Sequence, residues 1–244
     1  MAIPRFYCPA DLVSDTTVAL PSETAHHAVR VLRLKEGASI VLFDGRGGQY
    51  PATLALSGTQ AHARLGAHEP LEAELPGHVT LVQGLAAGEK MDWIIEKAVE
   101  LGAARVVPIA AQRSVLQLGG DRLRKRMEHW RRIVRAASEQ CGRNRIMALD
   151  EPRTLGQYLR EAEAAPSSML FCHPGADRTL AEALQDRPER ISLLVGPEGG
   201  WSDEEQALMA RQGLTPIAFG KRVLRTETAG LALIAAASAL CGWD

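Results

Sequence analysis

Four short apolar segments between residues 79 and 195 set the strongest limit on the fold of this chain. They span residues 79–82, 105–109, 168–172 and 191–195, and turn residues bound them. Apolar runs of this length are typical of strands that are buried on both faces of a sheet. Stretches with helical periodicity lie between them, so the sequence predicts a parallel α/β sheet. Such sheets bind ligands at the carboxyl ends of their strands, where we expect the functional site.

Two of the helices can be placed from their apolar residues. Residues 90–101 present one apolar face, and Gly102 is a natural stop. The net charge of the chain is −1, but residues 121–145 hold roughly nine basic residues against three acidic ones. This basic stretch predicts either a surface that meets RNA phosphates or an ordinary solvated helix face. Its apolar stripe is formed by Leu123, Met127, Trp130, Val134, Ala137 and Cys141.

The first part of the chain has a different pattern. Short alternating apolar runs at 39–43 and 50–56, separated by a glycine-rich turn cluster, predict a small β-rich domain. Ser22 is expected to cap one short helix within it. Residues 69–77, with two prolines and three glutamates, are typical of a linker. We therefore divide the chain into residues 1–72 and residues 73–244.

A glycine-rich turn, which we call the first elbow, follows the last predicted strand. It consists of Gly196, Pro197, Glu198, Gly199 and Gly200. Ser202 and Glu205 then have the spacing of a capping box at the start of a helix. Glycines in such a turn let a ligand approach the backbone amides, although many similar turns are only structural.

A second charged turn, which we call the second elbow, spans residues 219–229. It precedes an almost wholly apolar segment, residues 230–241, which predicts a buried helix that packs within the domain or against a second subunit. Thr226 and Thr228 are plausible caps of this helix. Arg225 and Glu227 are charges beside a buried helix start, where they need partners or a ligand.

Several classes of site are not supported by the sequence. Neither elbow has the glycine spacing of a dinucleotide fold or of a triphosphate loop. The four cysteines are far apart and are expected to be buried thiols, and His26 and His27 have no acidic or cysteine cluster beside them, so we expect no metal site.

There is no apolar run of membrane-spanning length and no targeting signal, so we expect a cytoplasmic protein without a membrane partner.

Five strings together resemble one known family. They are HAVRVLR (27–33), KMDWIIEKAVELG (90–102), EQCGRNR (139–145), LLVGPEGGWSDEE (193–205) and GKRVLRTETA (220–229). In this order they are similar to the bacterial methyltransferases that modify N3 of a uridine in 16S ribosomal RNA of the small subunit, a branch of the SPOUT superfamily. The chain departs from the family at Ala87, where a basic residue is usual, and at Ile146 and Met147, near which a proline is usual.

The resemblance implies a fold and a cofactor that periodicity does not reveal. It implies an N-terminal PUA-like β-barrel, a C-terminal SPOUT α/β domain with a deep trefoil knot, a homodimer, and S-adenosylmethionine as the cofactor. Outside the first elbow, the cofactor residues that it implies are His173, Pro174, Val195, Phe219, Gly220, Val223, Leu224, Arg225, Thr226, Thr228 and Ala229.

A mechanism for uridine N3 must remove the proton that this nitrogen carries and stabilise the resulting anion. No metal is needed. We expect Arg225 to stabilise the uracil, with Glu198 or Glu227 as proton acceptor or as the group that orients the arginine. The alternative is that Arg225 only forms a salt bridge that fixes the loop. The basic residues expected to contact RNA, together with one glutamine, are Arg30, Arg33, Lys90, Arg131, Arg132, Arg135, Gln140 and Arg143.

Two other classes of protein remain open at this point. One is a nucleotide-dependent oxidoreductase on a doubly wound sheet, against which the missing fingerprint counts. The other is a module that holds RNA without catalysis, using the β-rich domain and the basic helix.

Overall fold

The computed structural model describes residues 3–58, 60–116, 118–162 and 168–243. Its contacts divide the chain into two compact units. The first unit contains Met1–Glu74 and Arg135–Ile146, and the second contains Leu75–Val134 and Met147–Asp244. The sequence predicts a single boundary between residues 72 and 73. A single boundary in the sequence cannot assign residues 135–146 to the same unit as the N-terminal strands.

The first unit is built on a five-stranded sheet with the order β1-β3-β4-β5-β2. Its strands are β1 (Arg5–Tyr7), β2 (Thr17–Ala19), β3 (Ser39–Phe43), β4 (Tyr50–Ser57) and β5 (Gln60–Leu65). β1 and β3 are parallel, whereas the other pairs are antiparallel. The short helix α1 (Ser22–His26) continues into a π-helical turn, η1 (His27–Val31). Ser22 is the first residue of α1 and does not cap it; Pro21 is the N-cap and forms no side-chain bond.

The second unit contains a six-stranded sheet, β11-β9-β10-β6-β7-β8, in which every pair of neighbours is parallel. The four predicted strands are confirmed as β6 (His78–Gly84), β7 (Arg105–Ile109), β9 (Ser168–Cys172) and β10 (Arg190–Val195). The two edge strands, β8 (Ala148–Leu149) and β11 (Thr215–Ile217), were not predicted. They are too short to show a periodic pattern.

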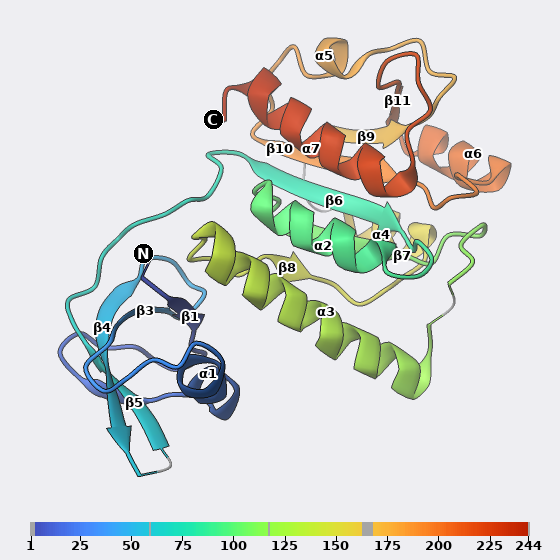
Figure 1. The fold of residues 1–244 in the computed structure, drawn as a ribbon. Coiled ribbons are helices and arrows are strands. Elements are labelled where there is room, and N and C mark those ends of the chain that lie inside the picture. The colour runs from blue at the N-terminus through green and yellow to red at the C-terminus, as the bar shows by residue number, and fades with distance from the viewer. Residues whose placement is uncertain (1–2, 59, 117, 163–167, 244) are drawn as a thin grey trace. The chain divides into compact units, whose positions relative to one another are not determined.

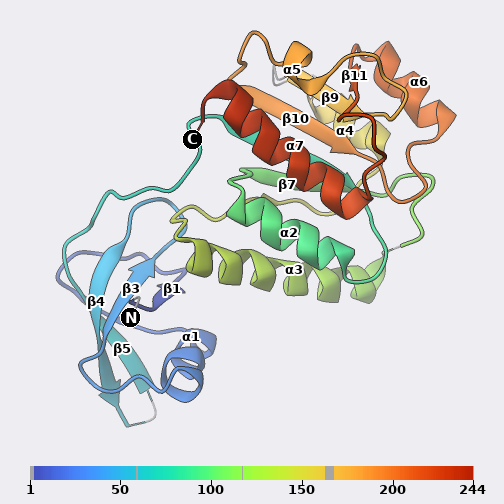
Figure 2. The same ribbon diagram turned by 45° about the horizontal axis from the view of Figure 1, so that its top comes forward.

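Helices cover both faces of this sheet (Figures 1 and 2). On one face lie α2 (Lys90–Glu100) and α7 (Thr226–Cys241), side by side. The other face packs against α4 (Leu155–Ala162) and α6 (Asp203–Arg211). Neighbouring residues of β6 show the two faces: Leu81 lies against Gly230 of α7, and Val82 lies in the core with Leu159 of α4 and Met209 of α6.

Two further helices complete the unit. A short helix, α5 (Leu180–Ala183), contacts α7, and α3 (Gly120–Cys141) runs beside α2. Asp92 of α2 accepts a hydrogen bond from Trp130 Nε1 of α3 at 2.9 Å and lies 2.7 Å from His129 Nε2. The predicted stripe of α3 is buried at Met127, Trp130, Val134 and Ala137, whereas Leu123 and Cys141 are only partly buried.

The C-terminal helix is buried on part of its surface within this chain. Its apolar composition predicts a helix that packs within the domain or against a second subunit, and Ala235, Ala239 and Leu240 are exposed here, with 38% of the surface of Leu240 accessible. Within this chain α7 therefore has one apolar face that nothing covers among the described residues.

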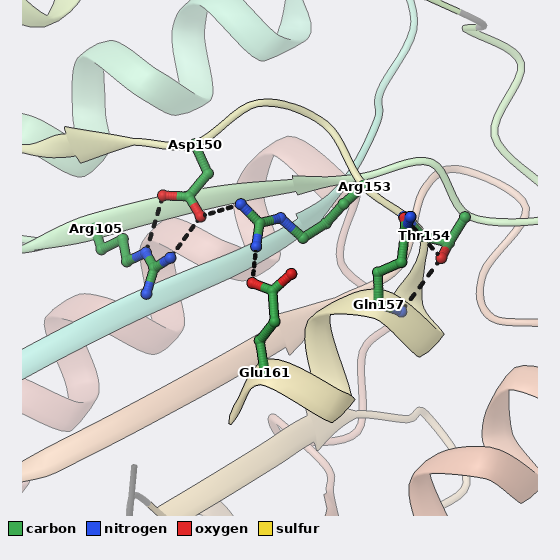
Figure 3. Close-up of polar contacts among 6 residues, drawn as sticks. All are labelled: Arg105, Asp150, Arg153, Thr154, Gln157 and Glu161. Atoms are coloured by element: carbon green, nitrogen blue, oxygen red, sulfur yellow. Dashed lines mark hydrogen bonds and ion pairs between the residues drawn. The ribbon is translucent and has the colours of Figure 1, made fainter. Parts of the chain in front are cut away.

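A chain of ion pairs joins β7, the end of β8 and α4 (Figure 3). Asp150 accepts hydrogen bonds from Arg105 Nε at 2.9 Å and from Arg153 Nη2 at 2.7 Å. Arg153 also pairs with Glu161 of α4. These contacts connect the two-residue edge strand β8 to β7 and to α4, whose start is also held by hydrogen bonds between Thr154 and Gln157.

Within the described part of the chain, no helix is long and apolar enough to cross a membrane. The same residues contain no group of three or more histidine, cysteine, aspartate or glutamate side chains that could hold a metal ion. The four cysteines are free thiols; Cys8 and Cys241 are buried, and Cys141 and Cys172 are partly buried.

Candidate active site

A cavity of about 600 Å³ lies at the carboxyl end of β10 in the second unit, where the sequence predicts the functional site. This volume is typical of small-molecule and cofactor sites. Both elbows line it, together with residues that follow β9 and the first residue of α2. Its predicted lining residues are His173, Pro174, Val195, the five residues of the first elbow, Val223, Leu224, Arg225, Thr226, Glu227 and Ala229.

The first elbow is a tight turn whose glycines are required by its own packing. Gly200 has a φ of 66°, which favours glycine, and its N–H donates to Pro197 O at 2.8 Å. A Cβ on Gly199 would lie 2.9 Å from Arg113 Cβ, and one on Gly196 would lie 3.1 Å from the backbone of Gly200. These contacts show a structural need for the glycines of the first elbow, which is one of the two readings that the sequence leaves open.

The helix that follows the first elbow begins as predicted. Ser202 and Glu205 form the capping box, with the Glu205 N–H donating to Ser202 Oγ at 3.1 Å and the Ser202 N–H donating to Glu205 Oε2 at 2.9 Å. This cap satisfies two N–H groups at the start of α6 and fixes where the turn ends.

Thr226 joins the two elbows. Its hydroxyl donates to Gly196 O at 2.6 Å and accepts a hydrogen bond from Gln83 Nε2 at 2.8 Å. Gln83 is fully buried on β6. The expectation that Thr226 and Thr228 cap α7 is wrong, because Arg225 is the N-cap and forms no side-chain capping bond. The Thr226 hydroxyl therefore links the second elbow to the first elbow and to β6, and does not cap α7.

Two glutamates and one lysine form a charged cluster in the cavity wall. Glu198 Oε1 accepts hydrogen bonds from Lys90 Nζ at 2.9 Å and from the Ala87 N–H at 3.1 Å. Partial burial alone would raise the pKa of Glu198, but the hydrogen bonds from Lys90 and from backbone amides outweigh it and lower that pKa. The pKa of Lys90 is raised, mainly by its hydrogen bond to Glu198. Glu198 is therefore an anion at neutral pH.

Glu227 lies on the other side of Lys90 and is less constrained. Its Oε2 is 3.6 Å from Lys90 Nζ, and this buried oxygen accepts no hydrogen bond from the described residues. Its Oε1 faces Arg225 Nη1 at 4.0 Å. Two cations thus flank this carboxylate without a hydrogen bond to it.

Arg225 is more exposed than its place beside a buried helix suggests. Its side chain keeps 83% of its surface, and the contact with Glu227 is at the limit of an ion pair. The sequence predicts that this arginine needs a partner or a ligand, and within the protein its partner is Glu227, at this long distance. An exposed pair of this kind contributes little to stability, so a role that merely fixes the loop is poorly supported.

Several lining residues were not predicted for the cavity. Lys90 was expected to contact RNA more widely, but its ammonium lies in the cavity wall. Lys90 and Arg113 both follow carboxyl ends of strands, so the topology of a parallel sheet is the signal that could have found them. Phe219, Gly220 and Thr228 were predicted as cofactor residues but do not line the cavity. The other unpredicted lining residues are Cys172, Trp201 and Gln206.

The residues expected to contact RNA fall into two groups. Arg30, Arg33, Arg131, Arg132 and Gln140 are exposed, and Arg135 is partly exposed, 3.9 Å from Glu23. Arg143 is different, because its side chain is only 3% exposed and forms a salt bridge with Glu74 at 2.5 Å. The structure therefore contradicts the expectation that Arg143 is presented to RNA; it is a buried pair within the first unit.

Comparisons with known proteins agree with this geometry. A model of the RNA methyltransferase domain matches residues 73–238, and a model of the RNA methyltransferase PUA domain matches residues 20–65. The ribosomal RNA small subunit methyltransferase E of Synechocystis is 32% identical over 97% of this chain and 77% of its own length. That of Bacillus subtilis is 30% identical over 91% of this chain and 90% of its own length.

Two solved structures are similar to the whole chain. One is a Legionella pneumophila protein, described as a methyltransferase, in complex with the bound cofactor SAM, with a TM-score of 0.90 and 32% identity over 98% of both chains. The other is the ribosomal RNA small subunit methyltransferase E from Neisseria gonorrhoeae bound to S-adenosyl methionine, with a TM-score of 0.88 and 33% identity over 98% of both chains.

A unit that matches the RNA methyltransferase PUA domain and a parallel α/β unit that matches the RNA methyltransferase domain, with a cavity at the strand ends, are the parts of an RNA methyltransferase. The chain belongs to the family of the ribosomal RNA small subunit methyltransferases E.

Proposed function

We propose that this protein transfers the methyl group of S-adenosylmethionine to N3 of one uridine in the 16S ribosomal RNA of the small subunit. The observation that carries the proposal is the cavity between the two elbows. The hydroxyl of Thr226 joins these elbows by its hydrogen bond to Gly196 O. Two solved relatives that match almost all of this chain contain S-adenosylmethionine. An enzyme of this class needs one cavity for the donor and a nearby group that accepts a proton.

The cavity suits the cofactor in size and chemistry. Val195, Pro174 and Leu224 offer apolar surface for an adenine ring, and the two elbows offer backbone groups to its edge. The wall holds charges of both signs: Glu198 and Glu227 suit an ammonium or a sulfonium, and Lys90, Arg113 and Arg225 suit a carboxylate. We propose as cofactor residues the predicted residues that line the cavity. When bound, S-adenosylmethionine supplies a methyl group on a positively charged sulfur.

The residues of the chain would then act on the uracil. Arg225 is exposed at the rim and is free to neutralise charge on a uracil oxygen when the N3 proton leaves. Glu198 and Glu227 are the two carboxylates in reach of the cavity, and one of them accepts the proton or orients the arginine.

RNA is bound by exposed basic residues outside the cavity in this proposal. Arg131 and Arg132 lie exposed on α3, and Arg30 and Arg33 lie exposed in the first unit. Arg33 has a φ of 54°, which is unusual for a residue with a side chain, and such strained positions cluster at functional sites. Arg135 and Gln140 extend the basic helix face.

We also propose that two copies associate and that the C-terminal segments form a trefoil knot, as the family resemblance implies. The exposed apolar residues Ala235, Ala239 and Leu240 of α7 support the dimer, because small residues allow two helices to approach closely. Ala239→Glu, measured by light scattering, is expected to produce monomers. Ribosomal RNA as substrate would place the protein in the cytoplasm.

The direct test uses small ribosomal subunits that lack the modification. Incubation with the protein and labelled cofactor, followed by digestion and mass spectrometry, is expected to give N3-methyluridine at one position. Free 16S RNA in a parallel reaction shows whether the assembled subunit is needed. Binding of S-adenosylmethionine without methyl transfer to either substrate would contradict the proposed reaction.

Arg225→Ala tests the assignment of the arginine. We expect a loss of about 100-fold or more in methyl transfer, of the size seen when a group that stabilises developing charge is removed. The melting temperature should hardly change, because the side chain is exposed. Unchanged turnover in the folded variant would remove Arg225 from the chemistry.

A further inference from the structure

The two carboxylates of the charged cluster are held differently. Glu198 already accepts two hydrogen bonds on Oε1, one of them from the Lys90 ammonium. Glu227 accepts none from the described residues, although Lys90 Nζ is 3.6 Å from Oε2 and Arg225 Nη1 is 4.0 Å from Oε1. A single lysine thus pairs with both glutamates, closely with Glu198 at 2.9 Å and more loosely with Glu227 at 3.6 Å.

We propose that Lys90 is a positioning residue that holds Glu198 by a hydrogen bond and leaves Glu227 at a longer distance, so that Glu227 is the proton acceptor. This inference rests on the proposed function, because it assigns roles within that reaction. It separates two glutamates that the sequence leaves equivalent.

The physical reason is the availability of lone pairs. A carboxylate that accepts a hydrogen bond from an ammonium is a weaker base, because protonation would break a charge-assisted bond. Glu198 is in that position, and its Oε1 also receives the Ala87 N–H. Glu227 Oε1 accepts no hydrogen bond from the described residues, since Arg225 Nη1 is 4.0 Å away. Protonation of this oxygen would therefore break no such bond.

In this assignment one proton leaves the uridine and one methyl group joins it. The N3–H bond of the uridine breaks towards Glu227 Oε1, and the electron pair left on N3 forms the bond to the methyl carbon. The bond between that carbon and sulfur breaks, and its electron pair stays on sulfur. The products are N3-methyluridine, S-adenosylhomocysteine and a protonated Glu227 that returns its proton to water.

Lys97 supplies a matched control for Lys90. It lies on the same helix, α2, and bridges Glu96 and Glu100 at 2.7 Å each. Its side chain is 25% exposed, compared with 34% for Lys90. If Lys90 were only a structural bridge, Lys90→Met and Lys97→Met would have similar effects.

The test measures single-turnover methyl transfer across pH, cofactor affinity by calorimetry, and melting temperature. We expect Glu227→Gln to slow transfer by about 100-fold or more, the usual contribution of a general base, with cofactor affinity within about threefold. Glu198→Gln should slow transfer less and weaken cofactor affinity more, because it loosens the first elbow. Lys90→Met should slow transfer by about tenfold or more and weaken cofactor affinity, because Glu198 loses its hydrogen bond from Lys90. Lys90→Arg should restore both, and Lys97→Met should change neither.

Other results would overturn the proposal in distinguishable ways. Near-normal transfer by Glu227→Gln, or a Lys90→Met variant that changes only in melting temperature, refutes the assignment while the proposed function stands. A larger loss of transfer in Glu198→Gln than in Glu227→Gln reverses the two roles and also refutes it. If the wild-type protein forms no N3-methyluridine, the proposed function and this assignment fail together.

Discussion

The hydroxyl of Thr226 is expected to carry the connection between the two elbows, and Thr226→Val tests this because valine keeps the shape and removes the hydroxyl. The change removes the bond to Gly196 O at 2.6 Å and the bond from Gln83 Nε2 at 2.8 Å. Each bond contributes about 1 kcal/mol net. The buried Gln83 amide keeps its bond to Gly84 O at 3.0 Å, so the extra cost of an unpaired group is limited. The total is about 2–3 kcal/mol.

For a chain of this length, a loss of about 2–3 kcal/mol lowers the melting temperature by roughly 4–10 °C. We also expect cofactor affinity to fall about tenfold, because the loss loosens the contact between the cavity walls. Thr226→Ser is the control: it keeps both bonds and loses one methyl group, at about 1 kcal/mol. Differential scanning fluorimetry and calorimetry measure the two effects. If the valine and serine variants behave alike in both, the hydroxyl does not hold the elbows together.

Three further outcomes follow from the same structure. Arg143→Ala should destabilise the protein by about 2–4 kcal/mol, because it leaves Glu74 without its buried partner; loss of RNA binding at an unchanged melting temperature would contradict this. Replacing Arg131, Arg132 and Arg135 together by glutamine should weaken RNA binding and reduce its salt dependence by a slope of about 2–3; an unchanged slope would place the RNA elsewhere. The lowered pKa of Glu198 means that its stabilisation is present above its ordinary value of 4.5 and is lost as pH falls through the lowered value. The difference in melting temperature between wild type and Glu198→Gln should therefore stay constant above the ordinary value of 4.5 and shrink as the pH falls below it, and a difference that stays constant below it would show that the charge has no part in it.

The parallel sheet could be predicted because each central strand is a local signal. Strands such as β7 and β10 are mostly apolar, and the capping box of α6 is a four-residue pattern. The edge strands carry no such signal. β8 has two residues, and it is held by Arg105 and Asp150, which lie 45 positions apart in the sequence. Contacts of that separation cannot be read from a periodic pattern.

The positions of the two elbows in the candidate site could be predicted from the sequence, but the contacts of their residues could not. The two elbows were found from glycines and from resemblance, yet the glycines of the first elbow are needed where Gly199 meets Arg113 and where Gly200 turns. The sequence shows that glycine is required at a position, but not whether a ligand or a neighbouring side chain requires it.

Lys90 and Arg143 show most clearly what the sequence does not reveal about a basic side chain, because both were predicted to contact RNA. Arg143 meets Glu74 from a position 69 residues away and becomes buried, whereas Lys90 meets Glu198 from 108 residues away and enters the cavity wall. The role of a basic residue thus depends on which carboxylate the fold brings to it. The same reasoning applies to Glu198 and Glu227: they are chemically identical in the sequence, and their distances to one ammonium, 2.9 Å and 3.6 Å, give them different roles. In the roles proposed above, a lysine in the cavity wall decides which glutamate can take the proton.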